Sequence, residues 1–128
     1  MKELENEFIK FWIEDDILYS RFKKPTIGNF ENTKAIIDLR TEISNGEKQY
    51  WLYDFNGIRS YDKEGRDYAD QYGQEHLFGC AVLLNSHIAK FILNTFMKLK
   101  KPTVPVKGFT KKEDAIHWLN ELKKVNNH

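Results

Sequence analysis

Residues 78–84 read Phe-Gly-Cys-Ala-Val-Leu-Leu, the most uniformly apolar stretch of the chain. A β-strand that is apolar at every position has no side suited to water. Such a strand belongs in the middle of a sheet whose two faces are both covered. The stretch therefore predicts a central strand with other layers of structure above and below it.

The rest of the chain alternates between strand and helix patterns. Two apolar runs, Phe8–Ile13 and Ile17–Phe22, flank the polar turn Glu14-Asp15-Asp16 and predict an N-terminal β-hairpin. A helix is expected next, with Ala35, Ile36, Leu39 and Ile43 on one face and a stop at Asn45-Gly46. A strand at Tyr50–Phe55, a helix from Asp62 to about His76 and the strand at Phe78–Leu84 follow it. The last three elements are a helix capped by Ser86, an edge strand at Val104–Phe109 and a helix with a Thr110–Glu113 capping box.

Strands that alternate with helices require a mostly parallel sheet with right-handed crossovers. We therefore expect one α/β domain over residues 1–128, with about five strands, an N-terminal hairpin and about four helices.

Composition and charge limit the classes of protein to which this chain can belong. A hydrophobic fraction of 41% excludes intrinsic disorder, and 20 Lys and Arg against 19 acids give no global charge for nucleic acid. The single Cys80 rules out an intramolecular disulfide, favours a reducing compartment and is expected to be a buried core residue. Because the chain has no apolar leader and no apolar stretch of roughly 20 residues, we expect a cytoplasmic protein without an integral membrane segment.

The segment from Asp54 to Ala69 is the most informative one for function. It reads Asp-Phe-Asn-Gly-Ile-Arg-Ser-Tyr-Asp-Lys-Glu-Gly-Arg-Asp-Tyr-Ala and follows the apolar run Tyr50–Tyr53. An apolar run that ends in acid, turn residues and glycine is typical of a buried strand that passes into a loop and then a helix. Asp62 is placed to cap that helix.

This spacing resembles the signature of anti-sigma-factor antagonist (STAS) domains, in which a strand ends in Asp-x-Ser-Gly and Asp-Ser-Ser-Gly opens the next helix. Asp54, Gly57, Asp62 and Gly65 fall on the matching positions without a gap. A second likeness lies in Phe109–Leu119, where Phe-x5-Ala-x2-Trp-Leu is similar to the closing helix of the bacterial STAS/Sec14-like group. The resemblance implies a STAS-like fold over nearly the whole chain and a regulatory, non-catalytic role exerted through a protein partner.

The resemblance also implies where such a partner would bind. In the family, the serine directly before the second glycine is phosphorylated, and here Lys63 and Glu64 replace the two serines of that element. Either Glu64 holds the domain in a phosphorylated-like state, or Asp62 and Glu64 are simply favourable at a helix start, where the macrodipole attracts negative charge. The predicted partner-binding residues are Asn56, Gly57, Arg59, Ser60, Asp62, Lys63, Glu64 and Gly65.

The sequence carries no motif for catalysis, for a metal or for a nucleotide. It has no His-x3-His, Cys-x2-Cys, Gly-x-Gly-x2-Gly or phosphate-cradling pattern. Ser86-His87 is not a nucleophile–base pair, because neighbouring residues of a helix point in different directions. We therefore expect no enzyme activity, no metal and no cofactor.

Three alternatives stay open. The apolar residues of the last two helices suggest a small-ligand or lipid-binding module with a pocket beneath those helices. Exposed aromatics such as Trp12, Trp51 or Trp118 would seed a homodimer. An uncharacterised enzyme would be recognised by a deep pocket that holds more than one titratable group.

Overall fold

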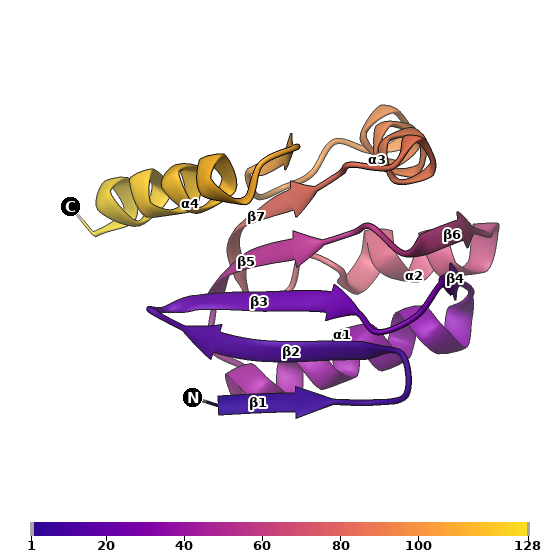
Figure 1. Cartoon of the computed structure of the whole chain (residues 1–128), viewed down its shortest axis with the longest axis horizontal. Coiled ribbons are helices and arrows are strands. Elements are labelled where there is room, and N and C mark those ends of the chain that lie inside the picture. Colours follow the sequence, from indigo (N-terminus) through magenta and orange to yellow (C-terminus); the bar gives the residue numbers. More distant parts are fainter. Residues whose placement is uncertain (1, 128) are drawn as a thin grey trace.

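The computed structural model describes residues 2–127, which form a six-stranded mixed sheet, a two-stranded sheet and four helices (Figure 1). The strands are β1 (Lys2–Glu5), β2 (Ile9–Glu14), β3 (Ile17–Phe22), β4 (Thr26–Gly28), β5 (Gln49–Asp54), β6 (Ile58–Tyr61), β7 (Leu77–Leu83) and β8 (Val106–Phe109). The helices are α1 (Phe30–Ser44), α2 (Lys63–Tyr72), α3 (His87–Leu99) and α4 (Lys112–Asn126). The main sheet has the order β1-β2-β3-β5-β7-β8, and β4 pairs with β6.

Strands β2 and β3 form the predicted N-terminal hairpin. They pair antiparallel, and Asp15 and Asp16 make the turn between them with φ angles of 51° and 63°. Positive φ at both central residues is the type I′ geometry, whose twist matches that of the flanking strands, and aspartate tolerates it. The structure therefore confirms both the hairpin and its turn.

The remaining strands of the main sheet run parallel. β3 pairs with β5, β5 with β7 and β7 with β8. β7 lies inside the sheet and β8 at its edge, as the apolar run and the proline before β8 predicted. The α/β class, the mostly parallel sheet, the N-terminal hairpin and the four helices of residues 2–127 are confirmed.

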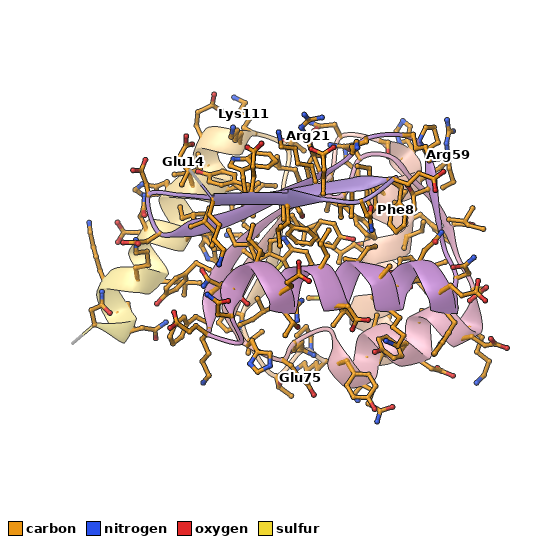
Figure 2. All side chains as sticks on the ribbon, turned by 90° about the horizontal axis from the view of Figure 1, so that it is seen from below. Phe8, Glu14, Arg21, Arg59, Glu75 and Lys111 are labelled. Carbon is orange, nitrogen blue, oxygen red and sulfur yellow. The ribbon has the colours of Figure 1, made fainter. Side chains whose placement is uncertain are left out.

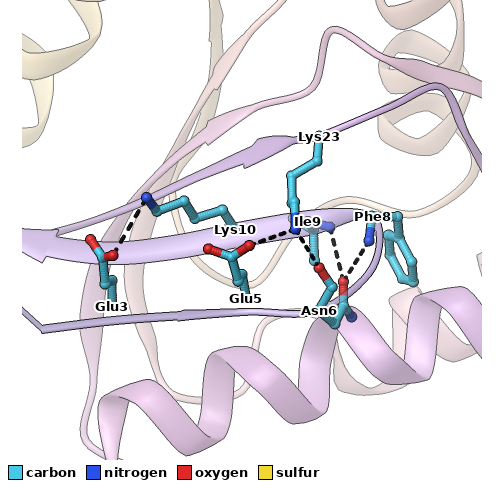
Figure 3. A network of polar contacts seen from close by, with 7 residues as sticks. All are labelled: Glu3, Glu5, Asn6, Phe8, Ile9, Lys10 and Lys23. Carbon is cyan, nitrogen blue, oxygen red and sulfur yellow. Dashed lines mark hydrogen bonds and ion pairs between the residues drawn. The ribbon is translucent and has the colours of Figure 1, made fainter.

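The main sheet has a sixth strand because β1 pairs antiparallel with β2. Figure 3 shows the turn that follows β1, in which the Oδ1 atom of Asn6 accepts hydrogen bonds from the backbone N–H groups of Phe8 and Ile9, both at 2.9 Å. Lys23 donates to the carboxylate of Glu5 beside it. Three of the four β1 residues are charged, so the sequence of β1 has no apolar strand pattern from which the strand could be predicted. Because β1 is an edge strand, these charges also protect the sheet from pairing with a further strand.

Helices cover both faces of the main sheet. Alternate residues of β5 point to opposite faces, so Trp51 and Tyr53 share one core with residues of α1 and α3, whereas Tyr50 and Leu52 share the other with α4. Figure 2 shows the side chains that fill the space between the sheet and α1. α2 packs beside α1, and Gly65 is its buried residue.

Three local expectations are wrong. β4 and β6 lie in segments expected to be loops, because strands of three and four residues are too short to show a period. α2 ends at Tyr72 instead of near His76, since the helix is capped by Gly73 and His76 has a positive φ of 60°. The Thr110–Glu113 capping box does not form, because α4 begins one residue later, after Lys111, with no side-chain capping bond.

The tryptophans offer less exposed surface than the homodimer alternative assumed. Trp51 is buried, with 5% of its surface exposed, so it cannot seed a dimer. Trp12 and Trp118 are half-buried: Trp12 stacks on Tyr19 and Trp118 packs against Phe109.

Candidate functional site

The predicted partner-binding segment begins with Asn56, which ties two strand ends together. Its Oδ1 atom accepts hydrogen bonds from the backbone N–H groups of Asn85 (2.7 Å) and Ser86 (3.1 Å), and its amide nitrogen donates to the Asp54 carboxylate (2.9 Å). These bonds join the chain after β5 to the chain after β7. Gly57 follows with a φ of 117°, a conformation that glycine adopts at little cost. Both residues thus have structural roles.

Asp62 and Gly65 build the start of α2. The Asp62 carboxylate accepts a hydrogen bond from the backbone N–H of Gly65 at 2.8 Å, which confirms the predicted helix cap. Gly65 is buried against Gly28, and a Cβ atom at position 65 would lie 2.1 Å from the Gly28 carbonyl oxygen. A close contact between two backbones therefore requires this glycine.

The other predicted residues of this segment lie on the surface. Lys63 forms an ion pair with Asp67, one helical turn later, at 2.8 Å. Glu64 is exposed in the first turn of α2, as the sequence suggested. The five exposed members of the predicted set are Arg59, Ser60, Asp62, Lys63 and Glu64.

A cavity of about 150 Å³ lies between the main sheet and the helices α1, α2 and α3. Trp51, Tyr53 and Phe55 form its aromatic wall on the sheet side, and Leu93 and Phe96 of α3 line it from the other direction. Of the last two helices, beneath which a pocket was expected, only α3 lines this cavity. α4 cannot contribute, because it covers the opposite face of the sheet.

The hydroxyl of Tyr53 is the buried side-chain polar atom of residues 2–127 that has no hydrogen-bond partner. The Tyr53 ring stacks on Trp51 with the centroids 4.2 Å apart and meets Phe55 edge-on at 5.1 Å. Burial raises the pKa of the hydroxyl well above its ordinary value, so the group is neutral and keeps its proton. An unsatisfied buried polar group costs about 1–3 kcal/mol. Tyr53, a residue of the cavity wall, therefore carries an unused hydrogen-bond donor.

Arg40 adds a positive charge to the same wall. Only 1% of its surface is exposed, and its guanidinium donates to the backbone carbonyl oxygens of Gly73 and Glu75, both at 2.7 Å. Burial lowers the pKa of Arg40 to about 10, with Cys80 acting most strongly in the opposite direction. A pKa of about 10 leaves the side chain charged at neutral pH.

Two further titratable groups in the cavity wall are neutral. Burial raises the pKa of the Cys80 thiol to about 12, and burial likewise raises the pKa of Tyr61 to about 12 against the opposing effect of its hydrogen bond with Thr33. Cys80 is a buried core residue, as predicted. With a pKa so high, its thiol is not a nucleophile at neutral pH. Arg40, Tyr53, Tyr61 and Cys80 therefore keep fixed protonation states near pH 7.

The cavity reaches the surface at the C-terminal end of α2. Asp70, Gln74 and Lys100 line both the cavity and a shallow groove on the surface beside it. The Oε1 atom of Gln74 accepts hydrogen bonds from the Thr103 hydroxyl and the Val104 backbone N–H, both at 3.0 Å. These bonds hold the segment after α3 against the end of α2, so they shape the opening.

Sequence reasoning missed Arg40 although the sequence contains a signal for it. Arg40 follows Ile36 by four positions and precedes Ile43 by three, which places a charge on the apolar face of the helix. The cavity itself left no comparable signal. Apolar spacing predicts which residues face the interior, and it is the same for a filled interior and for one with a void.

No helix within residues 2–127 has the length and apolarity needed to cross a bilayer. In that same range, His, Cys, Asp and Glu side chains form no cluster that could hold a metal ion. Comparisons with curated proteins and with solved structures gave no match. Residues 11–123, most of the chain, match the family model described as Domain of unknown function (DUF7793), and the chain therefore belongs to this family.

Proposed function

We propose that this domain binds a benzene-sized, mainly apolar molecule in the cavity beneath α1, α2 and α3. The observation that carries the proposal is the cavity of about 150 Å³, which is lined in part by Tyr53, a residue whose hydroxyl has no hydrogen-bond partner. Protein interiors are close-packed, and voids larger than a water molecule are few. A void of about 150 Å³ accommodates benzene in another protein, which sets the size of the ligand.

The charges around the cavity favour binding over catalysis. A general acid or base works best with a pKa near the operating pH. Burial instead raises the pKa values of Tyr61 and Cys80 to about 12, and that of Arg40 remains at about 10. Several titratable groups do line the pocket, as an enzyme would require, but the pKa values of these three buried groups suit fixed recognition roles. Asp70 also lines the pocket, and burial raises the pKa of its carboxyl.

Toluene is a suitable first probe, because it has the required size and no polar group. We expect a titration of the ¹³C-labelled protein, followed by NMR, to shift the methyl signals of Leu93 and Val82, which line the cavity. The Ala69→Leu variant should abolish the shifts, since Ala69 also lines the cavity and the larger side chain would fill it.

Ala35→Leu is the matched control for that variant. It adds the same side chain to another helix, α1, at a position outside the cavity wall. The control should bind toluene like the wild type. Equal responses of the wild type and Ala69→Leu, or no response at all, would refute binding in the cavity.

The second candidate is a regulatory domain that binds a protein partner. It is supported by five exposed side chains on β6 and at the start of α2, which are interrupted only by the half-buried Tyr61: Arg59, Ser60, Asp62, Lys63 and Glu64. The STAS resemblance favours the same surface. We expect affinity capture from native lysate to retain a partner with the wild type and to lose it with Asp62→Asn/Glu64→Gln, which removes both charges. A partner that is retained equally by both proteins would exclude this surface.

A further inference from the structure

Three charged residues line the cavity, Arg40, Asp70 and Lys100, and Arg40 is the buried one. Its guanidinium bonds to two backbone carbonyl oxygens, and among residues 2–127 no carboxylate forms an ion pair with it. The carboxylates that pair elsewhere lie on the surface. A buried charge that forms no ion pair favours the entry of an opposite charge beside it.

Tyr53 supplies the complementary donor. Its hydroxyl is wholly buried and has no partner, and Tyr53 lines the same cavity as Arg40. A phenolic O–H donates well to a carboxylate, and bonds to an ionised acceptor are about twice as strong as neutral ones. The rest of the wall is aromatic or aliphatic, which suits a flat ring.

We propose that the ligand of this cavity is a small aromatic acid, whose carboxylate accepts a hydrogen bond from Tyr53 beside the positive charge of Arg40. This inference rests on the proposed ligand-binding function and names the chemical class of the ligand. Arg40 loses its hydration when the protein folds. Binding of a carboxylate beside it therefore adds no desolvation cost for the guanidinium. The ring of the acid occupies the benzene-sized space between Trp51 and Phe96.

Three probes with one benzene ring each test the inference: sodium benzoate, benzamide and toluene. Each is titrated calorimetrically into the wild-type protein at pH 7. Benzamide has nearly the shape of benzoate but no charge. We expect benzoate to bind at least about ten-fold more tightly than benzamide, as for a bond to a charged group. If toluene binds but benzoate binds no more tightly than benzamide, the aromatic-acid inference is overturned while the proposed function stands. If none of the three binds, both fail.

Tyr53→Phe provides the second measurement, because it removes only the hydroxyl and leaves the ring in place. The variant should weaken benzoate binding by about ten-fold or more and leave toluene binding unchanged, since toluene accepts no hydrogen bond. Unchanged benzoate affinity in Tyr53→Phe would overturn the role of Tyr53. Unchanged benzoate affinity is also the result expected if the Tyr53 hydroxyl binds a water molecule and not the acid.

Discussion

The guanidinium carbon of Arg40 lies 4.8 Å from the centroid of the Trp51 ring, in the interior between α1 and the sheet. The face of an indole ring attracts a cation, and the attraction is worth roughly 2 kcal/mol or more once water is excluded. The same guanidinium donates to Gly73 and Glu75 at the end of α2. Arg40 therefore joins α1, β5 and the end of α2 through one planar group.

Replacement of Arg40 should show that the geometry of the guanidinium matters more than its charge. We expect Arg40→Lys to lower the free energy of unfolding by about 3 kcal/mol, because lysine keeps a buried charge but cannot reproduce the two-pronged contact with both carbonyls. Arg40→Met should be less damaging by about 1 kcal/mol or more, since it removes the charge and fills the same space. Urea unfolding of both variants measures the difference. A lysine variant more stable than the methionine variant would contradict this account.

Gly65→Ala should be destabilising, although alanine is usually the better helix residue by about 1 kcal/mol. The new Cβ would lie 2.1 Å from the carbonyl oxygen and 2.9 Å from the carbonyl carbon of Gly28, and both atoms belong to backbone that cannot move aside cheaply. We expect a loss of about 2–3 kcal/mol, typical of overpacking. Thermal unfolding against the exposed control Gln71→Ala on the same helix would measure it. A melting temperature equal to or above the wild type would disprove the contact.

The main elements could be predicted from the sequence because they are long enough to show a period. The hairpin turn at Asp15-Asp16, the stop at Asn45-Gly46 and the caps Asp62 and Ser86 all use local chemistry that depends on a few neighbouring residues. β4 and β6 could not be predicted, since their pairing joins segments about 30 residues apart and each is shorter than five residues. Pairing between distant short strands is a property of the whole fold.

The two candidate sites differ in the same way. The segment from Asn56 to Gly65 could be proposed from the sequence because its residues are adjacent in the chain. The cavity brings Arg40, Tyr53 and Phe96 together from three different elements, and the sequence states nothing of the empty space between them. Whether such residues touch or leave a void depends on how the side chains pack in the folded protein, and apolar spacing in the sequence does not specify this packing.

Two substitutions of Asp62 separate the effect of its capping bond from the effect of its charge at the start of α2. Asp62→Ala should lower the free energy of unfolding by about 1 kcal/mol, because the Gly65 N–H loses its acceptor. Asp62→Asn should cost less than about 0.5 kcal/mol, since asparagine caps a helix as well as aspartate does. Chemical denaturation of the two variants provides the measurement. Equal losses would mean that the charge, and not the capping bond, stabilises the helix.

The last prediction concerns alkaline pH and Cys80. Burial raises the pKa of its thiol from 9.0 to about 12, so the folded protein retains a proton that the unfolded chain loses above pH 9. The free energy of unfolding must then fall as pH rises, and between pH 8 and 10 this one group should remove about 1.4 kcal/mol. The buried hydroxyls of Tyr53 and Tyr61 act in the same direction at somewhat higher pH, whereas the lowered pKa of Arg40 acts against them.

Cys80→Ala isolates the contribution of the thiol. The variant should be less stable at pH 7 because it enlarges the cavity, but its stability should depend less on pH between 8 and 10. The quantity to compare is therefore the slope of the free energy of unfolding against pH, measured by urea titration at several pH values. Parallel slopes for the wild type and Cys80→Ala would mean that the thiol ionises as readily in the folded protein as in the unfolded chain. That result would place Cys80 in contact with water and would contradict its burial in the core.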